Sequence, residues 1–287
     1  MTTSMITPQA LVANVKDLIS LPEVYFSIRN IINDPSSSFA EVAEVVSQDP
    51  NIAARILRIA NSSFFGFATE IETVARAISI MGLSQLNDLV LATTVVRSFK
   101  GVPNDLVDMK HFWIRSVFCG SIARLLASHC NVLDSERLFV SGILHDLGHL
   151  LIYSKLPQQA ASILTRAKQE HINVVQLERE FLGWDYAQVS GELLKAWKLP
   201  VSHIETVACH TDLGKASEFR LDAAIVHIAS VMASREFQEK HGYPGELIFD
   251  PAAWQETGLM EEDLQPVRRE AEKHMTEVLK LLFARSL

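Results

Sequence analysis

The chain has 287 residues and a formal net charge of −8, with 48% hydrophobic and 21% charged residues. A chain of this length can bury about three quarters of the surface that its unfolded state exposes, so it can fold without a disulfide or a metal. Its composition is that of a globular protein and not of a disordered one. The acidic balance argues against a protein that binds a phosphate backbone, so we expect no nucleic-acid partner.

Cysteine usage and hydrophobic patterning predict a cytoplasmic protein. The three cysteines, Cys119, Cys130 and Cys209, lack metal-type spacing, which favours free thiols in a reducing compartment over a disulfide framework. The start of the chain has no basic segment and carries polar and charged residues within its apolar stretch, unlike a secretory signal. No run reaches about 18 apolar residues, so we expect no membrane span.

Apolar residues recur at intervals of three and four through the first hundred residues, which predicts helices. Two helix starts carry strong signals: a capping box formed by Ser38 and Glu41, and an N-cap at Asp49 followed by Pro50. The buried stripe of the second of these helices is expected to be Ile52, Ile56, Ile59 and Ala60. The other helices expected here are 24–32, 72–81 (ended by Gly82) and 84–99.

The segment Gly101-Val102-Pro103-Asn104-Asp105 is the best candidate boundary, because it is short and rich in helix breakers. We expect an N-terminal helical bundle over 1–105, a second helical half over 106–240 and a helical extension over 241–287. No strand is needed anywhere. The helices expected beyond the boundary are 108–130, 135–155, 158–171, 173–182, 186–198, 200–210, 219–240 and 263–284.

The sequence Leu144-His145-Asp146-Leu147-Gly148 places a His-Asp doublet inside an apolar helical run. A class of metal-dependent phosphohydrolases holds its cation with such a doublet and adds His and Asp ligands from other helices, because a cation in a bundle core must be surrounded from several sides. Two adjacent ligands alone make neither a closed nor a catalytic site. The function therefore depends on which further ligands are present.

Further motifs occur in a fixed order around the doublet. They are Leu21-Pro22, Asn33-Asp34-Pro35, Ser47-Gln48-Asp49-Pro50, Arg55-Ile56-Leu57-Arg58-Ile59-Ala60-Asn61-Ser62, Phe64-Phe65-Gly66, Ala77-Ile78-Ser79-Ile80-Met81-Gly82-Leu83, Phe112-Trp113, Gly142-Ile143-Leu144-His145-Asp146-Leu147-Gly148 and Trp197-Lys198-Leu199-Pro200. This series resembles the HDOD family, the HD-related output domains of bacterial signalling proteins. The resemblance covers about residues 15–235.

The resemblance implies an all-α fold, in which an HDOD-specific N-terminal bundle packs on an HD-like helical half, and a regulatory role. The chain departs from the family's ligand pattern at several positions. Where the pattern often has His two residues after Phe-Trp, this chain has Arg115, and Tyr186 stands where a later His is common. The usual His-His pair is Cys209-His210, and the closing Asp is Ser230.

Only His145, Asp146 and His210 remain of that ligand set. Arg115 has a further consequence, because a guanidinium stays protonated and cannot bind a metal. We hypothesise that Arg115 pairs with Asp146 by charge-assisted hydrogen bonds and balances the charge of the bundle core without a metal. No cofactor is therefore expected. The alternative is a divalent ion (Mn, Fe or Zn) held by His145, Asp146, His210 and His227.

These residues predict a non-catalytic signalling protein that binds a partner protein in trans, or a small ligand, through a degraded HD site. One alternative is a metal-dependent phosphohydrolase acting on a nucleotide or phosphoester, since three ligands and a water make a legitimate catalytic zinc site. A second alternative is a nucleotide-sensing module without hydrolysis, which a nucleotide would stabilise without metal or product.

Several other motifs favour structural interpretations. His145 and His149 have the spacing of a zinc-binding helix, but no third ligand follows and His149 is expected near the helix surface. His241-Gly242-Tyr243-Pro244-Gly245 indicates a turn at the end of a helix. Arg55 and Arg58 could belong to a DNA-binding helix-turn-helix, but the connection lacks the usual turn glycine. Phe64-Phe65-Gly66-Phe67 predicts either a plug between the two halves or an exposed partner surface.

Overall fold

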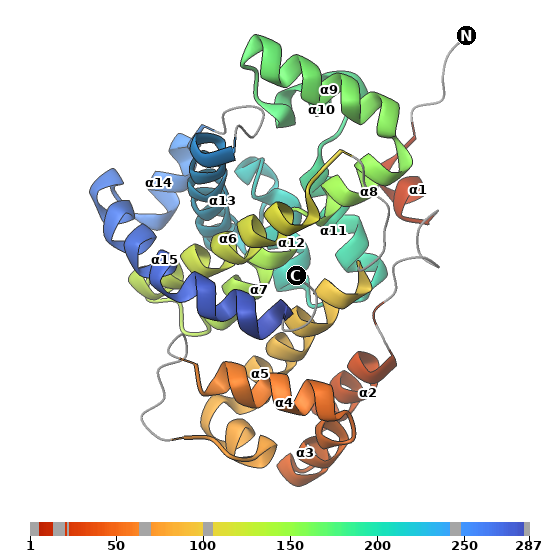
Figure 1. The fold of residues 1–287 in the computed structure, drawn as a ribbon, viewed down its shortest axis with the longest axis vertical. Coiled ribbons are helices and arrows are strands. Elements are labelled where there is room, and N and C mark those ends of the chain that lie inside the picture. Colours follow the sequence, from red (N-terminus) through yellow and green to blue (C-terminus); the bar gives the residue numbers. More distant parts are fainter. Residues whose placement is uncertain are drawn as a thin grey trace. The chain divides into compact units, whose positions relative to one another are not determined.

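The computed structural model describes residues 6–13, 21, 23–62, 70–99, 106–241 and 248–283. All regular elements in these ranges are helices (Figure 1), so the predicted all-α class is confirmed. The helices are α1 (Pro8–Ala13), α2 (Glu23–Ile32), α3 (Phe39–Ser47), α4 (Pro50–Ala60), α5 (Val74–Ser98), α6 (Met109–His129), α7 (Glu136–Leu144), α8 (Leu147–Lys155), α9 (Pro157–Glu170), α10 (Val174–Leu182), α11 (Tyr186–Ala196), α12 (Val201–Cys209), the 3-10 turn η1 (Leu213–Lys215), α13 (Arg220–His241), α14 (Pro251–Thr257) and α15 (Glu261–Phe283).

The chain divides into two compact units, one made of residues 19–101 and 272–287 and the other of residues 1–18 and 102–271. Helices α2 to α5 lie in the smaller unit, and α1 lies in the larger one, where it packs on α8 and α11. The expected three-part division stays a prediction, and its boundary segment 101–105 falls outside the described residues.

The local signals of the smaller unit act as the sequence predicts. Ser38 and Glu41 form both hydrogen bonds of a capping box, and Asp49 caps α4, which begins at Pro50. Gly82, at φ 83°, interrupts α5 where a helix end was expected. The buried face of α4 is Ile52, Ile56, Ile59 and Ala60, as predicted.

One helix among the described residues is long and apolar enough to cross a membrane. It is the stretch Val74–Val96 of α5, and 67% of the window that meets this criterion is buried inside the protein. Burial of that kind is also found in the core helix of a globular unit.

The structure corrects the expected helices at two places. The single helix predicted over 135–155 is two helices, because the chain turns at His145 and Asp146 between α7 and α8. Helices α1 and α14 were not expected. The turn matters for the site because the side chains of His145 and Asp146 point in directions that a continuous helix would not give them.

Close helix packing brings Arg115 to this turn. Helices α6 and α7 share more contacts than any other pair of elements, and they cross where two glycines face each other. A Cβ atom on Gly142 would lie 2.5 Å from the Gly120 Cα. Only glycine at both positions permits this approach, which holds Arg115 of α6 beside the α7–α8 turn.

Candidate functional site

The site lies in the larger unit, around the turn between α7 and α8. Arg115 comes from α6, Tyr186 begins α11, His210 follows α12, and His227 and Ser230 belong to α13. The residues that were predicted from sequence therefore converge from separate helices, as a site in a bundle core requires.

Arg115 and Asp146 form the ion pair that the sequence predicts. An Arg115 Nη2 group donates to the Asp146 Oδ2 atom. The Arg115 residue is 4% exposed and Asp146 is fully buried. Taking both charges out of water is costly, so the arrangement needs a direct pair with further hydrogen bonds around it.

His149 and Glu178 extend this pair, and the sequence analysis missed both. The Asp146 Oδ1 atom accepts from His149 Nδ1, while His149 Nε2 lies 3.1 Å from Glu178 Oε1. The second Glu178 oxygen accepts the backbone N–H of Tyr186 at 2.8 Å. His149 is 3% exposed, so the expectation that it lies near the helix surface is wrong.

A sequence signal for Glu178 was nevertheless present. Glu178 follows Val174 and precedes Leu182 at intervals of four residues, and both of these are buried on the apolar face of α10. A carboxylate on such a face must meet a buried cation or donor. His149 gave no equivalent signal, because α8 is buried on nearly every side.

The four side chains make an alternating row of charges, Arg115, Asp146, His149 and Glu178, which we call the charge row. Burial by itself would raise the pKa of Asp146, but Arg115 and His149 outweigh it and hold that pKa below its usual range. Burial opposes a charged His149, yet the carboxylates of Asp146 and Glu178 raise its pKa well above the ordinary value. Burial raises the pKa of Glu178, against the opposing effect of His149, and the row alternates basic and acidic side chains.

Two tyrosine rings stack on the His149 imidazole. The Tyr186 ring stacks on it with centroids 4.0 Å apart and planes 21° apart. The Tyr153 ring stacks at 5.2 Å and 18°. Aromatic rings stacked on a charged imidazole add cation–π stabilisation, which favours the protonated form of His149.

His145 and His210 are neutral histidines oriented by backbone carbonyls. Nδ1 of His145 donates to the Gly142 carbonyl at 2.6 Å, and Nδ1 of His210 donates to the Val207 carbonyl at 2.7 Å. Burial lowers the pKa of His145 to about 4 and lowers the pKa of His210 well below its usual value. With Nδ1 protonated, His210 Nε2 accepts the Tyr186 hydroxyl at 2.9 Å.

Two further predicted site residues, His227 and Cys209, have different surroundings. His227 donates from Nδ1 to the His210 carbonyl at 2.8 Å and accepts the Asp250 N–H on Nε2 at 2.8 Å, so both its ring nitrogens are occupied. Burial, with the nearby carboxylates of Glu205 and Asp212, raises the pKa of Cys209 to about 11. Cys209 is not among the residues that line the adjoining cavity.

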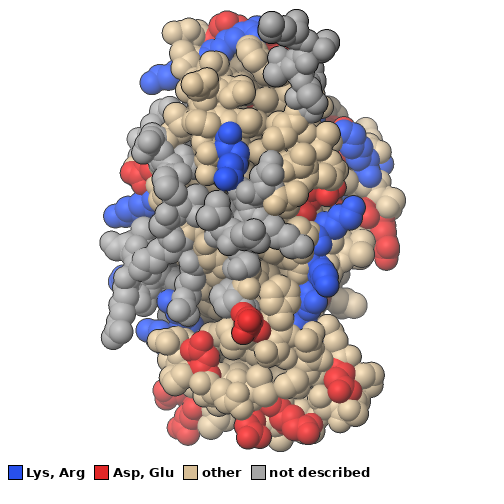
Figure 2. Space-filling view, turned by 90° about the vertical axis from the view of Figure 1, so that its right-hand side faces the viewer, with Lys and Arg blue, Asp and Glu red and all other residues tan. Residues whose placement is uncertain are grey.

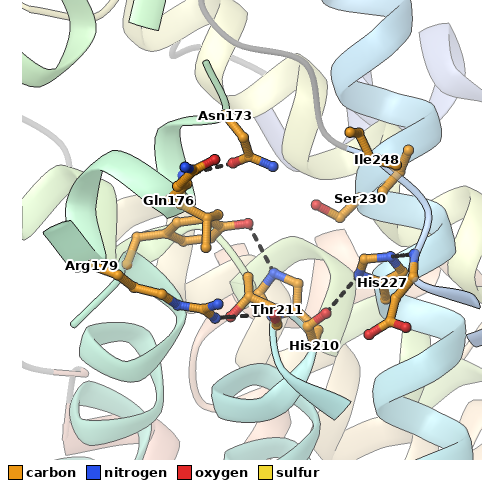
Figure 3. Close-up of a pocket in the computed structure, with 12 residues that line it drawn as sticks. Asn173, Gln176, Arg179, His210, Thr211, His227, Ser230 and Ile248 are labelled. Carbon is orange, nitrogen blue, oxygen red and sulfur yellow. Dashed lines mark hydrogen bonds between the residues drawn. The ribbon is translucent and has the colours of Figure 1, made fainter. Parts of the chain in front are cut away.

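That cavity, of about 330 Å³, opens beside the charge row (Figure 3). Its mouth is at the surface, since Ile248 is 68% exposed. Helices α10, α11 and α13, the end of α12 and the segment before α14 supply its walls. The lining residues are Asn173, Val175, Gln176, Arg179, Tyr186, His210, Thr211, His227, Ser230, Val231, Ile248 and Asp250.

The residues present do not fit a divalent metal. Both Asp146 oxygens accept from cations, both His227 nitrogens are bonded, and His210 Nε2 accepts the Tyr186 hydroxyl. Within the described ranges, no group of three or more His, Cys, Asp and Glu side chains has an arrangement that could hold a metal. A guanidinium next to Asp146 also repels a divalent ion, since like charges in a low dielectric interact strongly.

An all-helical fold with a His-Asp turn at its centre defines an HD-like protein. The family model of the HDOD domain matches residues 18–213, and the chain belongs to this family. An "Uncharacterized protein" of Treponema pallidum (strain Nichols) is 22% identical over 208 residues, which make up 71% of this chain. The chain covers only 39% of the length of that relative.

Two solved structures share the fold over nearly the whole chain. A "Putative phosphohydrolase" from Shewanella amazonensis SB2B is 25% identical, with a TM-score of 0.70, and the match covers 95% of this chain and 96% of that one. A "Putative signal transduction protein" from Marinobacter aquaeolei VT8 is 20% identical, with a TM-score of 0.68, covering 94% of this chain and 60% of that one. These names describe those proteins.

Proposed function

We propose that this HDOD protein is a non-catalytic regulatory protein of bacterial signalling, which acts in the cytoplasm by binding a small ligand or a partner protein at its altered HD site. The observation that carries the proposal is the Arg115 guanidinium on the Asp146 carboxylate. A positive side chain is bonded to one oxygen of the carboxylate that a metal would need as a ligand, and it cannot lose its charge.

The rest of the charge row supports the same conclusion. His149 holds the second oxygen of Asp146, and Glu178 stands behind His149. The row balances its own charges, so the site needs no added cation to compensate the buried carboxylates. Hydrolysis of a phosphoester requires a metal-activated water in this class of site, whereas both oxygens of Asp146 are already paired with side chains of the protein, which favours recognition over hydrolysis.

A metal-dependent phosphohydrolase is the second candidate, because the Shewanella protein of the same fold carries that name. His145, Asp146 and His210 would then hold the ion, with His227 as an additional ligand. This function requires Arg115 to leave Asp146, and it requires His227 to give up the backbone hydrogen bond on whichever ring nitrogen binds the metal. Fold alone does not assign the activity.

Elemental analysis of the purified protein tests the proposal. Protein prepared without chelator is dialysed separately against manganese, iron and zinc, and its metal content and its activity on phosphoester substrates are measured. We expect less than one tenth of an ion per chain, as an order of magnitude, and no turnover. Stoichiometric metal that disappears in Asp146→Ala, together with hydrolysis, would overturn the proposal. Arg115→His serves as the matched variant, since it removes the guanidinium and supplies an imidazole ligand.

The partner is expected to bind in trans, and a protein partner and a small ligand give different signatures. A small ligand raises the stability of the purified protein by itself, because it binds only the folded state. A nucleotide that stabilises the protein without metal or product would indicate the nucleotide-sensing alternative. If the partner is a protein, none of the small ligands tested should shift the thermal unfolding transition of the purified chain.

A further inference from the structure

The cavity beside the charge row offers polar groups that the fold leaves unused. The Ser230 side chain points into the cavity (Figure 3), and Ser230 is 2% exposed. Its Oγ atom is buried and makes no hydrogen bond of ordinary geometry with the described residues, although its hydroxyl lies close enough to the Tyr186 phenol to act on it as a weak donor. A buried hydroxyl without a partner costs free energy, and a ligand can supply the missing bond.

Asn173 contributes a hydrogen-bond donor whose orientation is fixed. Its Oδ1 atom accepts the Val175 N–H at 2.8 Å and caps α10, so its amide nitrogen is turned the other way, toward the Ser230 side of the cavity (Figure 3). This bond also decides the identity of the oxygen and the nitrogen of the amide. Asn173 thus presents an N–H donor to a ligand.

Tyr186 contributes an acceptor. Its hydroxyl proton is donated to His210 Nε2, because His210 Nδ1 keeps its own proton for the Val207 carbonyl. The lone pairs of the Tyr186 oxygen therefore remain as acceptors. One wall of the cavity presents a donor at Asn173, a hydroxyl at Ser230 and an acceptor at Tyr186, while Val175, Val231 and Ile248 add apolar surface.

The charges of the lining argue against an anionic ligand. Arg179 is the cation among the lining residues, and it is bonded to the Asp185 carboxylate at 2.7 Å and to the Thr211 carbonyl at 3.0 Å. Asp250 adds a carboxylate at the cavity. The two imidazoles of the lining are bonded in the neutral pattern described above, so a phosphate would enter without an uncommitted positive group to meet it.

From this arrangement we propose that the cavity binds an uncharged, planar heterocycle with an amide edge, such as an oxo-pyrimidine or oxo-purine base, and does not recognise phosphate. The carbonyl of the amide accepts from Asn173, and its N–H donates to Tyr186 or Ser230. The volume of about 330 Å³ lies at the small end of ligand pockets, which measure about 300 to 1,000 Å³. This inference rests on the proposed non-catalytic function and names the ligand class of that site.

The inference can be tested by calorimetric titration of the full chain. The ligands are the free bases uracil and hypoxanthine, the nucleoside 5′-monophosphates that carry these bases, and inorganic phosphate. We expect at least one free base to bind with a Kd below about 1 mM, at least as tightly as its monophosphate, and inorganic phosphate not to bind. Tighter binding of the monophosphate, binding of phosphate alone, or no binding of either base would overturn it.

Two variants test where the ligand binds, and a third variant serves as their control. Asn173→Asp keeps an N-cap acceptor for α10 and replaces the N–H donor by a carboxylate, while Ser230→Ala removes the unused hydroxyl. Each should weaken base binding about tenfold or more. Ser234→Ala is the matched control, because Ser234 is one turn further along α13, is also buried with no hydrogen-bond partner in the described part of the chain, and does not line the cavity. Equal effects of the two serine variants would contradict the assignment.

The two proposals fail in different ways. Stoichiometric metal with phosphoester turnover would overturn the proposed function, whatever the bases do. A protein that stays free of metal and turnover, but binds none of the bases, would overturn only the ligand class.

Discussion

The Arg115 guanidinium is a cation of the protein itself that lies on the Asp146 carboxylate. The buried carboxylate thus has an internal partner. Such a pair gives little net stability compared with a well-packed apolar pair, but it is costly to break from one side, because the remaining charge stays buried. The consequence can be measured.

We expect Arg115→Met to lower the free energy of unfolding by about 3 to 5 kcal/mol, because it leaves Asp146 charged and buried without its cation. The double variant Arg115→Met/Asp146→Asn should lose less than the sum of the two single variants, since it removes both charges. Urea unfolding at neutral pH measures all three.

The control for this prediction is Lys215→Met, which removes an exposed ion pair with Asp212 at 3.0 Å. It should change the free energy of unfolding by less than about 1 kcal/mol. If the Arg115 variant is as stable as this control, then Arg115 does not compensate the charge of the buried Asp146 carboxylate.

His149 should stay protonated above neutral pH, in contrast to His145 and His210. The Asp146 and Glu178 carboxylates raise its pKa, so its contribution to stability is fully present below the unfolded pKa of about 6.5. It is then lost as the pH rises through the folded pKa. Ring-nitrogen NMR signals measure the charge directly.

The neighbouring histidines provide the internal control for that titration. The pKa values of His145 and His210 are lowered, the former to about 4, so their contribution is present above the unfolded pKa and is lost as the pH falls. Their rings should remain neutral at pH 6 and above. A His149 ring that loses its proton near its ordinary pKa would contradict the charge row.

At the scale of helices, close packing of α8 on α11 aligns the charge row with Tyr186. The Gly148 N–H donates to Ser190 Oγ at 2.7 Å, and a Cβ at Gly148 would lie 2.0 Å from the Tyr186 carbonyl. Tyr186 can stack on His149 because glycine at this position lets the two helices approach.

The Gly148→Ala variant therefore tests which effect on the free energy of unfolding is larger at this position, the helix propensity of alanine or its clash with α11. Propensity alone would make alanine more favourable by about 1 kcal/mol. We expect instead a loss of about 2 kcal/mol or more from the clash with the α11 backbone. Thermal and urea unfolding give the sign. Gly214→Ala is the control, since its Cβ would meet only an Asp212 oxygen at 3.4 Å, and a stabilised Gly148→Ala would refute the argument.

At the scale of the whole molecule, the distribution of charge opposes nucleic-acid binding. The lower part of the face in Figure 2 is rich in carboxylates, and exposed acidic residues of the smaller unit are Glu23, Asp34, Glu41, Glu44, Glu70 and Glu72. Arg55 and Arg58, the residues of the helix-turn-helix alternative, donate to the backbone carbonyls of Thr93 and Ala54. The acidic residues of the smaller unit and the engagement of these arginines with backbone carbonyls both argue against contact of this unit with a phosphate backbone.

We expect no binding of duplex DNA below about 100 μM protein at low salt, which is the weak end of non-specific affinity. Fluorescence anisotropy of a labelled duplex measures this, and a basic DNA-binding protein serves as the positive control. Binding that weakens steeply as salt is added would restore the DNA-binding alternative.

Features that arise from neighbouring residues could be predicted from the amino-acid sequence. The capping box at Ser38, the Asp49-Pro50 helix start and the break at Gly82 all depend on local backbone chemistry. The ordered motifs were sufficient to place the chain in its family, and the family pattern singled out Arg115 as a replaced ligand. The interpretations of Phe64-Phe65-Gly66-Phe67 and of Gly242-Tyr243-Pro244-Gly245 fall outside the described residues.

The arrangement of charges in the site depends on how the helices pack in three dimensions. Glu178 of α10 and His149 of α8 meet because two helices far apart in sequence pack together, and no local pattern specifies that contact. The turn at His145 and Asp146 likewise requires the neighbours that hold it, since the sequence there reads as one continuous apolar helix. Buried charges choose partners by distance in space, so the residues of the site could be named from the sequence, but their pairing could not.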